Sequence, residues 1–490
     1  MYYMIYKNPI IKGFYPDPSI CRAGDKYYLV CSTFQYMPGV PVFESSDLVS
    51  WKQVGNALTR SSQVSLETVP SSGGVFAPTI RYNNGRFYMV TTNDTLHRNF
   101  YVYTDDITGE WSEPVYVDQG GIDPSLLFDG EKVYFLSNGQ DDFGSWGITQ
   151  CEIDIETGAK LTQSKVIWQG SGGRYLESPH MYKIGKNYYL TAAEGGTEYG
   201  HMVTYARSDD PWGKFEGYSS NPVLTNRNKG GFEIQGVGHG DLIRSPGGEW
   251  FILHLAFRQI GQYEMYHHLG REVYMTPVRF DEDGWFTCGN DGTTEFEYEI
   301  NCDAVQEPLT EQTFKTIDRR LELLRLRKYV PENYDLSDER YILHGTDVTI
   351  DQAASPTFAA LRQRDMNGTL KCSVSADSGE AGITVYIDEG HHYDVSVREK
   401  SGGFEAVLTL NIGSIKHEQK TLPLDSNSAD IRIVFDSHTY SFYADSTLMG
   451  SASTRYLSSE VAGGFTGVVF GMYAQNKGTG TFTDLSVTYR

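Results

Sequence analysis

Basic residues are scarce in this sequence of 490 residues. It has 41 Lys and Arg against 63 Asp and Glu, which gives a formal net charge of −22 at pH 7. Phosphate backbones and anionic lipid headgroups repel so acidic a chain. We therefore predict that it has no nucleic-acid partner and does not bind a membrane.

Long apolar runs and paired cysteines are missing as well. No run approaches the roughly 20 apolar residues of a membrane-spanning helix, and the first residues lack the basic and apolar regions of a signal peptide. The six cysteines are scattered, without the spacing of a disulfide framework or a C-x-x-C metal site. We expect buried, reduced thiols and a cytoplasmic protein, an expectation that a signal peptide removed from ahead of Met1 would overturn.

Aromatic residues and glycine, by contrast, are abundant, with 34 Tyr, 24 Phe, 7 Trp and 51 Gly. Aromatic side chains fit a pleated surface, and glycine forms the turns between strands. The composition therefore predicts an all-β protein. The length predicts two to four domains of roughly 100–200 residues each.

A short motif recurs five times in the first 300 residues. Each copy has a two-residue anchor, a short strand, a turn and a second strand, and an apolar or aromatic residue follows the second anchor position by nine. The anchors are Asp17-Pro18, Ala77-Pro78, Asp123-Pro124, Ser178-Pro179 and Gly240-Asp241. Each copy is typical of a β-hairpin, which cannot bury its apolar face alone. Five four-stranded sheets arranged radially can, so the repeat predicts a five-bladed β-propeller over residues 1–300. A β-sandwich of similar strand content would not produce five matching anchors.

Three repeats place a carboxylate where their first strand begins: Asp17 in the first, Asp123 in the third and Glu177 in the fourth. First strands line the centre of a propeller, so these side chains should converge at one mouth of a central channel. Turn formation explains one Asp before Pro, but like charges in a confined site raise one another's proton affinity, and a fold does not gather them for stability. Two carboxyl groups about 6.5–9.5 Å apart can hydrolyse a glycosidic bond with inversion, as general acid and general base.

Residues 301–313 are polar and are expected to link this domain to a second one at 314–490. Strand-like runs with short turns recur there, for example at 383–387 and 467–473. β-Branched and aromatic runs of this kind predict a β-sandwich.

The segments around the three carboxylates resemble the catalytic motifs of glycoside hydrolase family 43. They read Tyr15-Pro16-Asp17-Pro18-Ser19, Gly121-Ile122-Asp123-Pro124-Ser125 and Leu176-Glu177-Ser178-Pro179-His180. The second domain is similar to the concanavalin-like (jelly-roll) sandwich of the family's β-xylosidase branch, notably at residues 355–358 and 362–363. The resemblance covers nearly the whole chain, and it implies a five-bladed β-propeller followed by a concanavalin-like β-sandwich.

The same resemblance implies roles for charged residues. Asp17 would be the general base that activates water, and Glu177 the general acid that protonates the leaving oxygen. Asp123 would stay ionised, orient Glu177 and keep its proton in place. Arg271 matches a family arginine that reaches into the pocket, where it would bind sugar hydroxyls and keep nearby carboxylates charged. A surface ion pair is the alternative for Arg271.

Three aromatic residues are candidates for sugar stacking. Phe34 lies in a segment that resembles the family loop around the non-reducing sugar. Phe76 stands where the family commonly has Trp, which leaves a smaller stacking surface. Trp146 is a candidate wall for the aglycone side. Core packing is the alternative for each of them.

His239 opens the fifth repeat. The resemblance places it near the active site or as a ligand of a divalent cation, often calcium; oxygen ligands or waters would have to complete the shell. The other interpretation is a hydrogen-bonding histidine with no metal. We predict no required cofactor.

Together these residues predict an inverting exo-glycosidase that releases xylose from the non-reducing end of short xylo-oligosaccharides. An α-L-arabinofuranosidase with the same pocket is the nearest alternative, and a non-catalytic carbohydrate-binding protein is the third. A lectin, however, has no need of a third carboxylate. Family resemblance also suggests a homo-oligomer.

Overall fold

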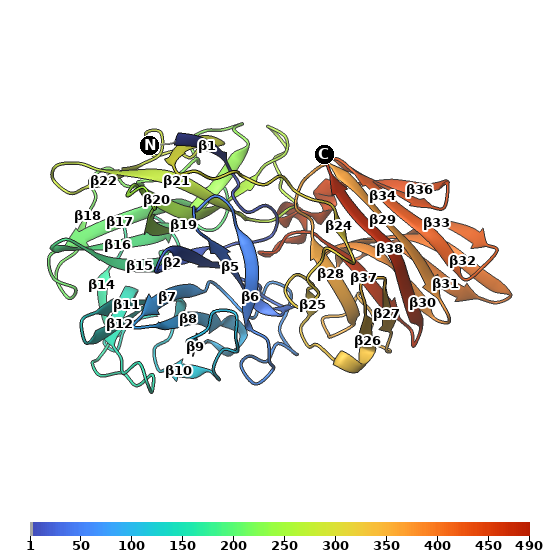
Figure 1. Cartoon of the computed structure of the whole chain (residues 1–490), viewed down its shortest axis with the longest axis horizontal. Helices are drawn as coiled ribbons and strands as arrows, with labels where there is room; N and C mark the ends of the chain where they lie inside the picture. The colour runs from blue at the N-terminus through green and yellow to red at the C-terminus, as the bar shows by residue number, and fades with distance from the viewer. Residues whose placement is uncertain (1–2) are drawn as a thin grey trace.

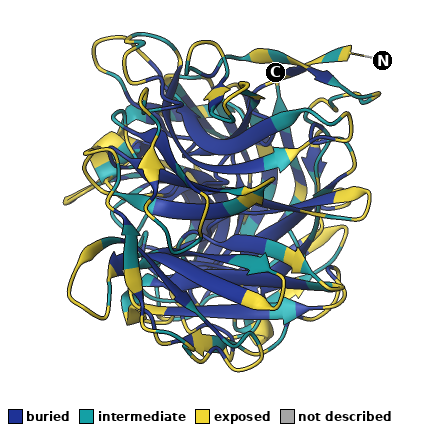
Figure 2. Ribbon diagram, turned by 90° about the vertical axis from the view of Figure 1, so that its left-hand side faces the viewer, coloured by how far each residue is buried: buried dark blue, intermediate teal, exposed yellow. Residues whose placement is uncertain are grey.

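The computed structural model describes residues 3–490 and consists mainly of strands. Two all-β bodies lie side by side, with residues 3–301 in one and the C-terminal part of the chain in the other (Figure 1). The inner strands are buried along most of their length, and exposed residues gather at the turns (Figure 2).

Five four-stranded antiparallel sheets follow one another along the described part of the N-terminal body. Their first strands contact one another in cyclic order, and the last of them contacts the first. The sheets therefore form a closed ring, which agrees with the expected propeller, and each repeat of the sequence forms one sheet. In chain order the strands are β2 (Ser19–Ala23), β3 (Lys26–Val30), β5 (Gly39–Ser45) and β6 (Lys52–Leu58); β7 (Thr79–Asn83), β8 (Arg86–Asn93), β9 (Arg98–Thr104) and β10 (Val115–Val117); β11 (Ile122–Asp129), β12 (Lys132–Gln140), β13 (Trp146–Glu152) and β14 (Lys165–Trp168); β15 (Glu177–Ile184), β16 (Asn187–Glu194), β17 (Met202–Ser208) and β18 (Glu216–Gly217); β19 (Ile234–Arg244), β20 (Trp250–Arg258), β21 (Glu272–Phe280) and β22 (Phe286–Cys288).

The sequence repeat corresponds to a repeated register. Tyr27 pairs with Arg22, and the equivalent residues Phe87, Val133 and Tyr188 each pair with the residue five positions before them. These four aromatic or apolar side chains are buried. The spacing is therefore conserved by hairpin geometry and by packing between sheets.

The two ends of the propeller are joined outside these five sheets. β1 (Tyr3–Lys7) pairs with β23 (Glu297–Asn301). The side chain of Asn8 donates to the carbonyls of Met275 and Glu295, each at 2.9 Å. These contacts fix the start of the propeller chain to its last blade.

The C-terminal body is a sandwich of an eight-stranded and a six-stranded sheet within the described residues. One apolar cluster fills the space between them, with Val374 and Phe442 from one sheet and Val385 and Leu408 from the other. The β-sandwich prediction is confirmed. The first sheet contains β24 (Gln312–Thr313), β26 (Tyr334–Leu336), β27 (Arg340–His344), β29 (Gly368–Ala376), β34 (Ser428–Phe435), β35 (Thr439–Ala444), β36 (Thr447–Ser453) and β38 (Thr479–Tyr489); the second contains β28 (Thr357–Arg362), β30 (Glu380–Asp388), β31 (His391–Lys400), β32 (Gly403–Ile412), β33 (Ile415–Leu424) and β37 (Val469–Gln475).

Helices are few and short in residues 3–490: Asp94–Leu96, Pro331–Asn333 and Thr454–Leu457 are 3-10 turns, and α1 spans Ser459–Ala462. None of them has the length or apolar character needed to cross a membrane.

The junction between the bodies differs from the sequence prediction in two details. Residues 302–311 contain no strand, but β24, which the sequence places in the linker, pairs with β38 of the sandwich. β25 (Arg325–Leu326), which the sequence places in the sandwich domain, pairs with β4 (Tyr36–Met37) of the propeller. Two-residue pairings are too short to produce a readable periodicity.

Candidate active site

The three carboxylates lie where the first strands of three blades depart from regular geometry. Asp17 (φ 55°) lies two residues before β2, Asp123 (φ 53°) lies in β11, and Glu177 is followed in β15 by Ser178 (φ 57°). The registers of β11 and β15 with their neighbouring strands shift at these positions. A left-handed non-glycine residue costs on the order of 1–3 kcal/mol, and such residues cluster at functional sites. A bulge also re-aims the side chains it carries.

Asp17 is held as an anion by three neighbours. Its Oδ2 accepts from the Ser32 hydroxyl at 2.5 Å, and its Oδ1 accepts from Arg271 Nη1 at 2.8 Å. Nδ1 of His239 lies 3.6 Å from the same Oδ1. Burial alone would raise the pKa of Asp17, but Arg271, His239 and Ser32 together hold it below its ordinary value.

Asp123 is connected to Asp17 through two side chains. Its Oδ2 accepts from the backbone N–H of Ser178 at 3.1 Å and from the Ser178 hydroxyl at 2.9 Å. The hydroxyl oxygen is also 2.8 Å from Nδ1 of His239. Burial and the charge of Asp17 raise the pKa of Asp123, whereas His239 and the Ser178 hydrogen bonds oppose that rise.

The pKa of Glu177 shifts in the opposite direction from that of Asp17. Its side chain is 20% exposed, against 8% for that of Asp17. Burial, followed by the charges of Asp123 and Asp17, raises the pKa of Glu177 well above its ordinary value. The three carboxylates therefore lie close enough to influence one another, and the pKa values of Asp17 and Glu177 move in opposite directions.

His201, on the loop before β17, was not identified from the sequence. Its Nδ1 lies 3.3 Å from the carbonyl of Gly236, so Nδ1 must be the donor, and its Nε2 lies 4.0 Å from Oε1 of Glu177. Burial, with the charges of His239 and Arg271, lowers the pKa of His201 to about 3. A neutral imidazole therefore turns a lone pair toward the proposed acid. A single histidine in a loop carries no sequence signal for this position.

Phe34 and Phe76 belong to an aromatic cluster that includes a residue of the sandwich. The ring of Phe465 stacks on Phe34 at 5.8 Å, and Phe76 meets both rings edge-on at 5.5 and 6.1 Å. The Arg271 guanidinium lies 5.8 Å from the centre of the Phe34 ring and 5.7 Å from that of Phe465. Two domains therefore build this wall around the arginine that contacts Asp17.

The segment that carries Phe465 is attached to the propeller along its length. The backbone N–H of Phe465 donates to the Ser72 hydroxyl at 2.8 Å, and the carbonyl of Phe465 accepts from Arg271 Nη2 at 3.2 Å. Glu460 accepts from the backbone N–H of His267 at 3.1 Å. An aromatic residue within Gly463-Gly464-Phe465-Thr466-Gly467 is the sequence signal that could have identified this loop.

Trp146 is not part of this cluster. It begins β13, an inner strand of the third blade, its side chain is 64% exposed, and its carbonyl accepts from Gln169 Nε2 at 3.0 Å. Among residues 3–490 the structure joins its indole to none of the three carboxylates by a hydrogen bond.

The surroundings of His239 do not suit calcium. No group of three His, Cys, Asp or Glu side chains that could hold a metal occurs among residues 3–490. Nδ1 of His239 is engaged by Ser178, and the neighbouring imidazole of His180 already faces the Arg81 guanidinium at 3.0 Å. Calcium prefers six to eight oxygen ligands, and a fixed positive charge repels it. The geometry favours the hydrogen-bonding interpretation of His239.

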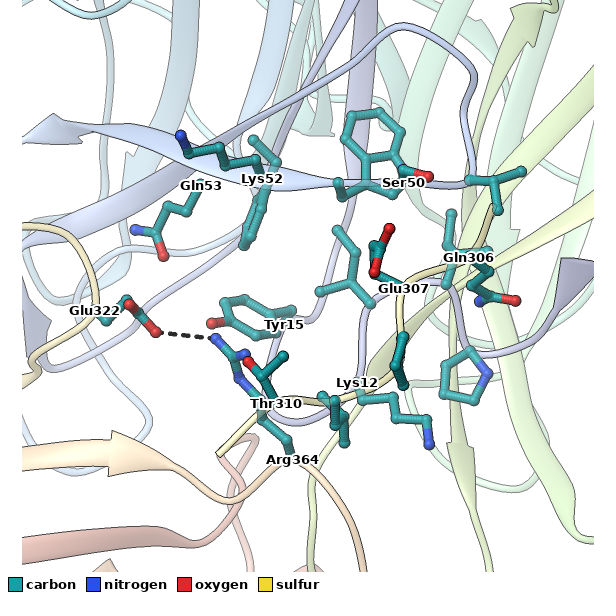
Figure 3. Close-up of a pocket in the computed structure, with 18 of the residues that line it drawn as sticks. Lys12, Tyr15, Ser50, Lys52, Gln53, Gln306, Glu307, Thr310, Glu322 and Arg364 are labelled. Atoms are coloured by element: carbon teal, nitrogen blue, oxygen red, sulfur yellow. Dashed lines mark hydrogen bonds and ion pairs between the residues drawn. The ribbon is translucent and has the colours of Figure 1, made fainter. Parts of the chain in front are cut away.

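A large cavity of about 1010 Å³ lies elsewhere, between the first blade, the linker and the start of the sandwich (Figure 3). Lys12 and Tyr15 line it from the propeller side, Glu307 lies in it from the linker, and Glu322 pairs with Arg364 at 3.0 Å. It contains none of the three carboxylates and is not the candidate active site.

Comparison with known proteins agrees with this geometry. Residues 6–286 match the model of glycosyl hydrolases family 43, and residues 311–487 match the β-xylosidase C-terminal concanavalin A-like domain. The chain belongs to glycoside hydrolase family 43. As a member of that family it is an enzyme that acts on glycosides, so the non-catalytic alternative is set aside.

Its relatives in the family include enzymes for both pentoses. A non-reducing end α-L-arabinofuranosidase of Bacteroides ovatus is 38% identical, over 96% of this chain and 92% of its own length. A xylosidase/arabinosidase of Butyrivibrio fibrisolvens is 33% identical, over 97% of this chain and 96% of its own. The crystal structure of a xylan β-1,4-xylosidase from Bacillus halodurans matches 99% of this chain and 100% of its own, with a TM-score of 0.91 and 28% identity.

Proposed function

We propose that this family 43 enzyme is an inverting exo-β-xylosidase that removes xylose from the non-reducing end of short xylo-oligosaccharides. The feature that supports it best is that the pKa values of two carboxyl groups in one site move in opposite directions. Arg271, His239 and Ser32 hold the pKa of Asp17 below its ordinary value, whereas burial, Asp123 and Asp17 raise the pKa of Glu177 well above its own. Inverting glycosidases need one base and one acid at the same pH.

The chemistry assigned to these groups is a single displacement. Glu177 gives its proton to the glycosidic oxygen as the bond from that oxygen to the anomeric carbon breaks. A water molecule attacks the opposite face of that carbon, and Asp17 takes the proton that the water loses. The products are a free sugar of inverted configuration and the shortened alcohol. Asp123, through Ser178, holds the strand beside Glu177, and its charge raises the proton affinity of the acid.

The sandwich segment supports release from the chain end. Phe465 packs against Phe34 and Phe76, and its backbone holds Arg271, so this segment closes one side of the site. A site closed on one side admits a terminal sugar more readily than the middle of a polymer. We propose a cytoplasmic location because the six cysteines are unpaired in the described residues. Short substrates suit that location.

The second candidate is α-L-arabinofuranosidase activity at the same site. It is favoured by the relatives, because one with 38% identity is named for that activity and another for both. The replacement of a family Trp by Phe76 leaves the stacking surface open to either pentose. We give xylose first because the C-terminal domain matches the β-xylosidase model.

Hydrolysis of p-nitrophenyl β-D-xylopyranoside and p-nitrophenyl α-L-arabinofuranoside tests the two candidates directly. Proton NMR of the first product formed tests the stereochemistry, since inversion of a β-xyloside releases α-xylose. Asp17→Ala and Glu177→Ala are the inactive controls. Initial release of β-xylose would contradict inversion, and turnover of neither glycoside would contradict the proposed function.

A further inference from the structure

A second group of charges lies at the centre of the propeller, behind the three carboxylates. Arg81 extends from β7 of the second blade and reaches three other blades. Its Nη1 donates to Asp241 Oδ2 at 2.9 Å and lies 3.3 Å from the Ser19 hydroxyl, and its Nη2 is 3.0 Å from His180 Nδ1. One guanidinium thus joins the first, second, fourth and fifth blades.

Asp241 depends on this guanidinium. The carboxylate is fully buried and also accepts from the Ser19 hydroxyl at 2.7 Å, the Ile20 N–H at 3.0 Å and the Tyr182 hydroxyl at 2.5 Å. Burial alone would raise the pKa of Asp241, but Arg81 and these hydrogen bonds hold it well below its ordinary value. A buried charge that loses its partner is strongly destabilised, so the pair is built to stay intact.

Arg81 also fixes the tautomer of His180. A guanidinium only donates, so Nδ1 of His180 must accept and its hydrogen resides on Nε2. The ring is 1% exposed, and Nε2 has no partner among the described side chains. His180 therefore presents an N–H, and not a lone pair, inside the propeller. A metal ion needs the lone pair.

The arrangement continues from His180 to the reacting groups. Its ring lies 5.9 Å from that of His239. His239 in turn lies 3.6 Å from Asp17 and 2.8 Å from Ser178, which binds Asp123. The orientation of His180 therefore limits where His239 can sit behind the proposed base.

We propose that Arg81 is the resident cation of the propeller centre. Paired with Asp241, it occupies the lone pair on Nδ1 of His180 that a divalent ion would need, and it positions His180 and His239 behind Asp17. Arg81 is a positioning residue in this scheme, because it acts through the two histidines. The expected change in kcat rests on the proposed function, whereas the expected binding of guanidinium does not.

The test uses the full-length chain with Arg81→Ala. This substitution leaves a space that free guanidinium fits, beside the carboxylate of Asp241. Arg86→Ala is the matched control, because Arg86 is in the same blade but pairs with the exposed Asp105 at 2.7 Å. Guanidinium chloride is added in the tens of millimolar, far below denaturing concentrations. A ligand that binds only the native state raises Tm.

We expect guanidinium to raise the Tm of Arg81→Ala selectively, with no rise for wild type or Arg86→Ala. On an aryl pentoside, kcat of Arg81→Ala should fall about tenfold or more, as for other residues that orient a reacting group. The acidic limb of its pH profile should move upward, because Asp17 loses its ordered neighbours, and guanidinium should restore both. Wild-type turnover should be unchanged by a chelator or by added calcium.

Three results would overturn the proposal: a folded Arg81→Ala with wild-type kcat and pH profile, a Tm rise shared by Arg86→Ala, or loss of wild-type turnover on chelation. If Arg81→Ala does not fold, the double variant Arg81→Met with Asp241→Asn removes both charges. We expect that variant to fold with reduced kcat, and wild-type kcat would show that Arg81 only balances Asp241. A wild-type enzyme that cleaves no pentoside would refute the proposed function, whereas the Tm measurement needs no substrate.

Discussion

The propeller and the sandwich are both antiparallel, yet they treat buried charge in different ways. The propeller gathers Asp17, Asp123, Asp241 and Arg271 near its centre, beside residues with left-handed backbone and shifted registers. The sandwich encloses a continuous apolar cluster between two long sheets. In the propeller, polar groups therefore collect where the ladder is broken, whereas the space between the two sheets of the sandwich is apolar and its buried charged histidine, His392, lies outside that cluster. The sandwich nevertheless reaches the site, because one of its loops contributes Phe465.

The largest effect is expected at Glu177, where the register of β15 shifts in the propeller. Glu177→Gln keeps the shape of the acid but removes its proton, so kcat on xylobiose should fall by roughly 10²–10⁴. Stability should stay the same or rise, because one of three crowded carboxyl groups is gone. Steady-state kinetics and thermal melting measure the two quantities.

Asp105→Asn is the control for that variant, because Asp105 is an exposed carboxylate that pairs with Arg86. It should leave kcat unchanged. A Glu177→Gln enzyme with normal kcat on xylobiose would remove Glu177 from the reaction.

The next effect concerns the charged histidine of the sandwich. His392 is fully buried between Asp394 at 2.9 Å and Asp351 at 3.1 Å, with Asn411 also in contact and Lys416 paired to Asp351. Burial alone would lower the pKa of His392, but the two carboxylates raise it to about 9. Since the folded pKa lies above the unfolded value of 6.5, this stabilisation is complete below pH 6.5 and is lost as pH rises through 9.

Urea unfolding at pH 6 and at pH 9.5 should therefore differ by up to about 3 kcal/mol in the free energy of unfolding. His392→Gln should remove that difference and leave kcat at pH 6 unchanged. If the free energy of unfolding depends on pH equally in wild type and in His392→Gln, the titration of His392 does not cause that dependence.

The third prediction tests the contribution of the sandwich to the propeller site. Phe465→Ala removes the ring that stacks on Phe34 but leaves the backbone carbonyl that holds Arg271. We expect KM for xylobiose to rise about tenfold, as for the loss of roughly 1.4 kcal/mol of binding, with a smaller change in kcat. Phe143→Ala, at an exposed aromatic residue of the propeller, is the comparison. Equal KM values for both variants would mean that the loop does not line the site.

The smallest effect is expected at Trp146, the exposed first residue of β13. Trp146→Ala should leave KM for an aryl xyloside nearly unchanged. If its exposed indole serves the aglycone side, KM for xylotetraose should rise about two- to threefold, the scale of a partly exposed aromatic contact. If KM is unchanged for xylo-oligosaccharides of every length, Trp146 does not contact the substrate.

Much of this molecule follows from local sequence. The five anchors, the turn glycines and the nine-residue offset determined the hairpins, because period-two strands joined by short turns leave a readable pattern. Asp17, Asp123 and Glu177 were found for the same reason: they stand at equivalent positions of repeats. The β-branched and aromatic runs at 383–387 and 467–473 likewise predicted strands, and they form parts of β30 and β37.

Only the tertiary structure decided which residues complete the site. Phe465 reaches Arg271 from the other domain, Ser178 reaches Asp123 from the next blade, and His201 reaches Glu177 within the fourth blade. No local pattern encodes these partners. Protonation was decided there too, because Asp17 and Glu177 are ordinary acids in an unfolded chain. Burial and the placement of Arg271 separate their pKa values.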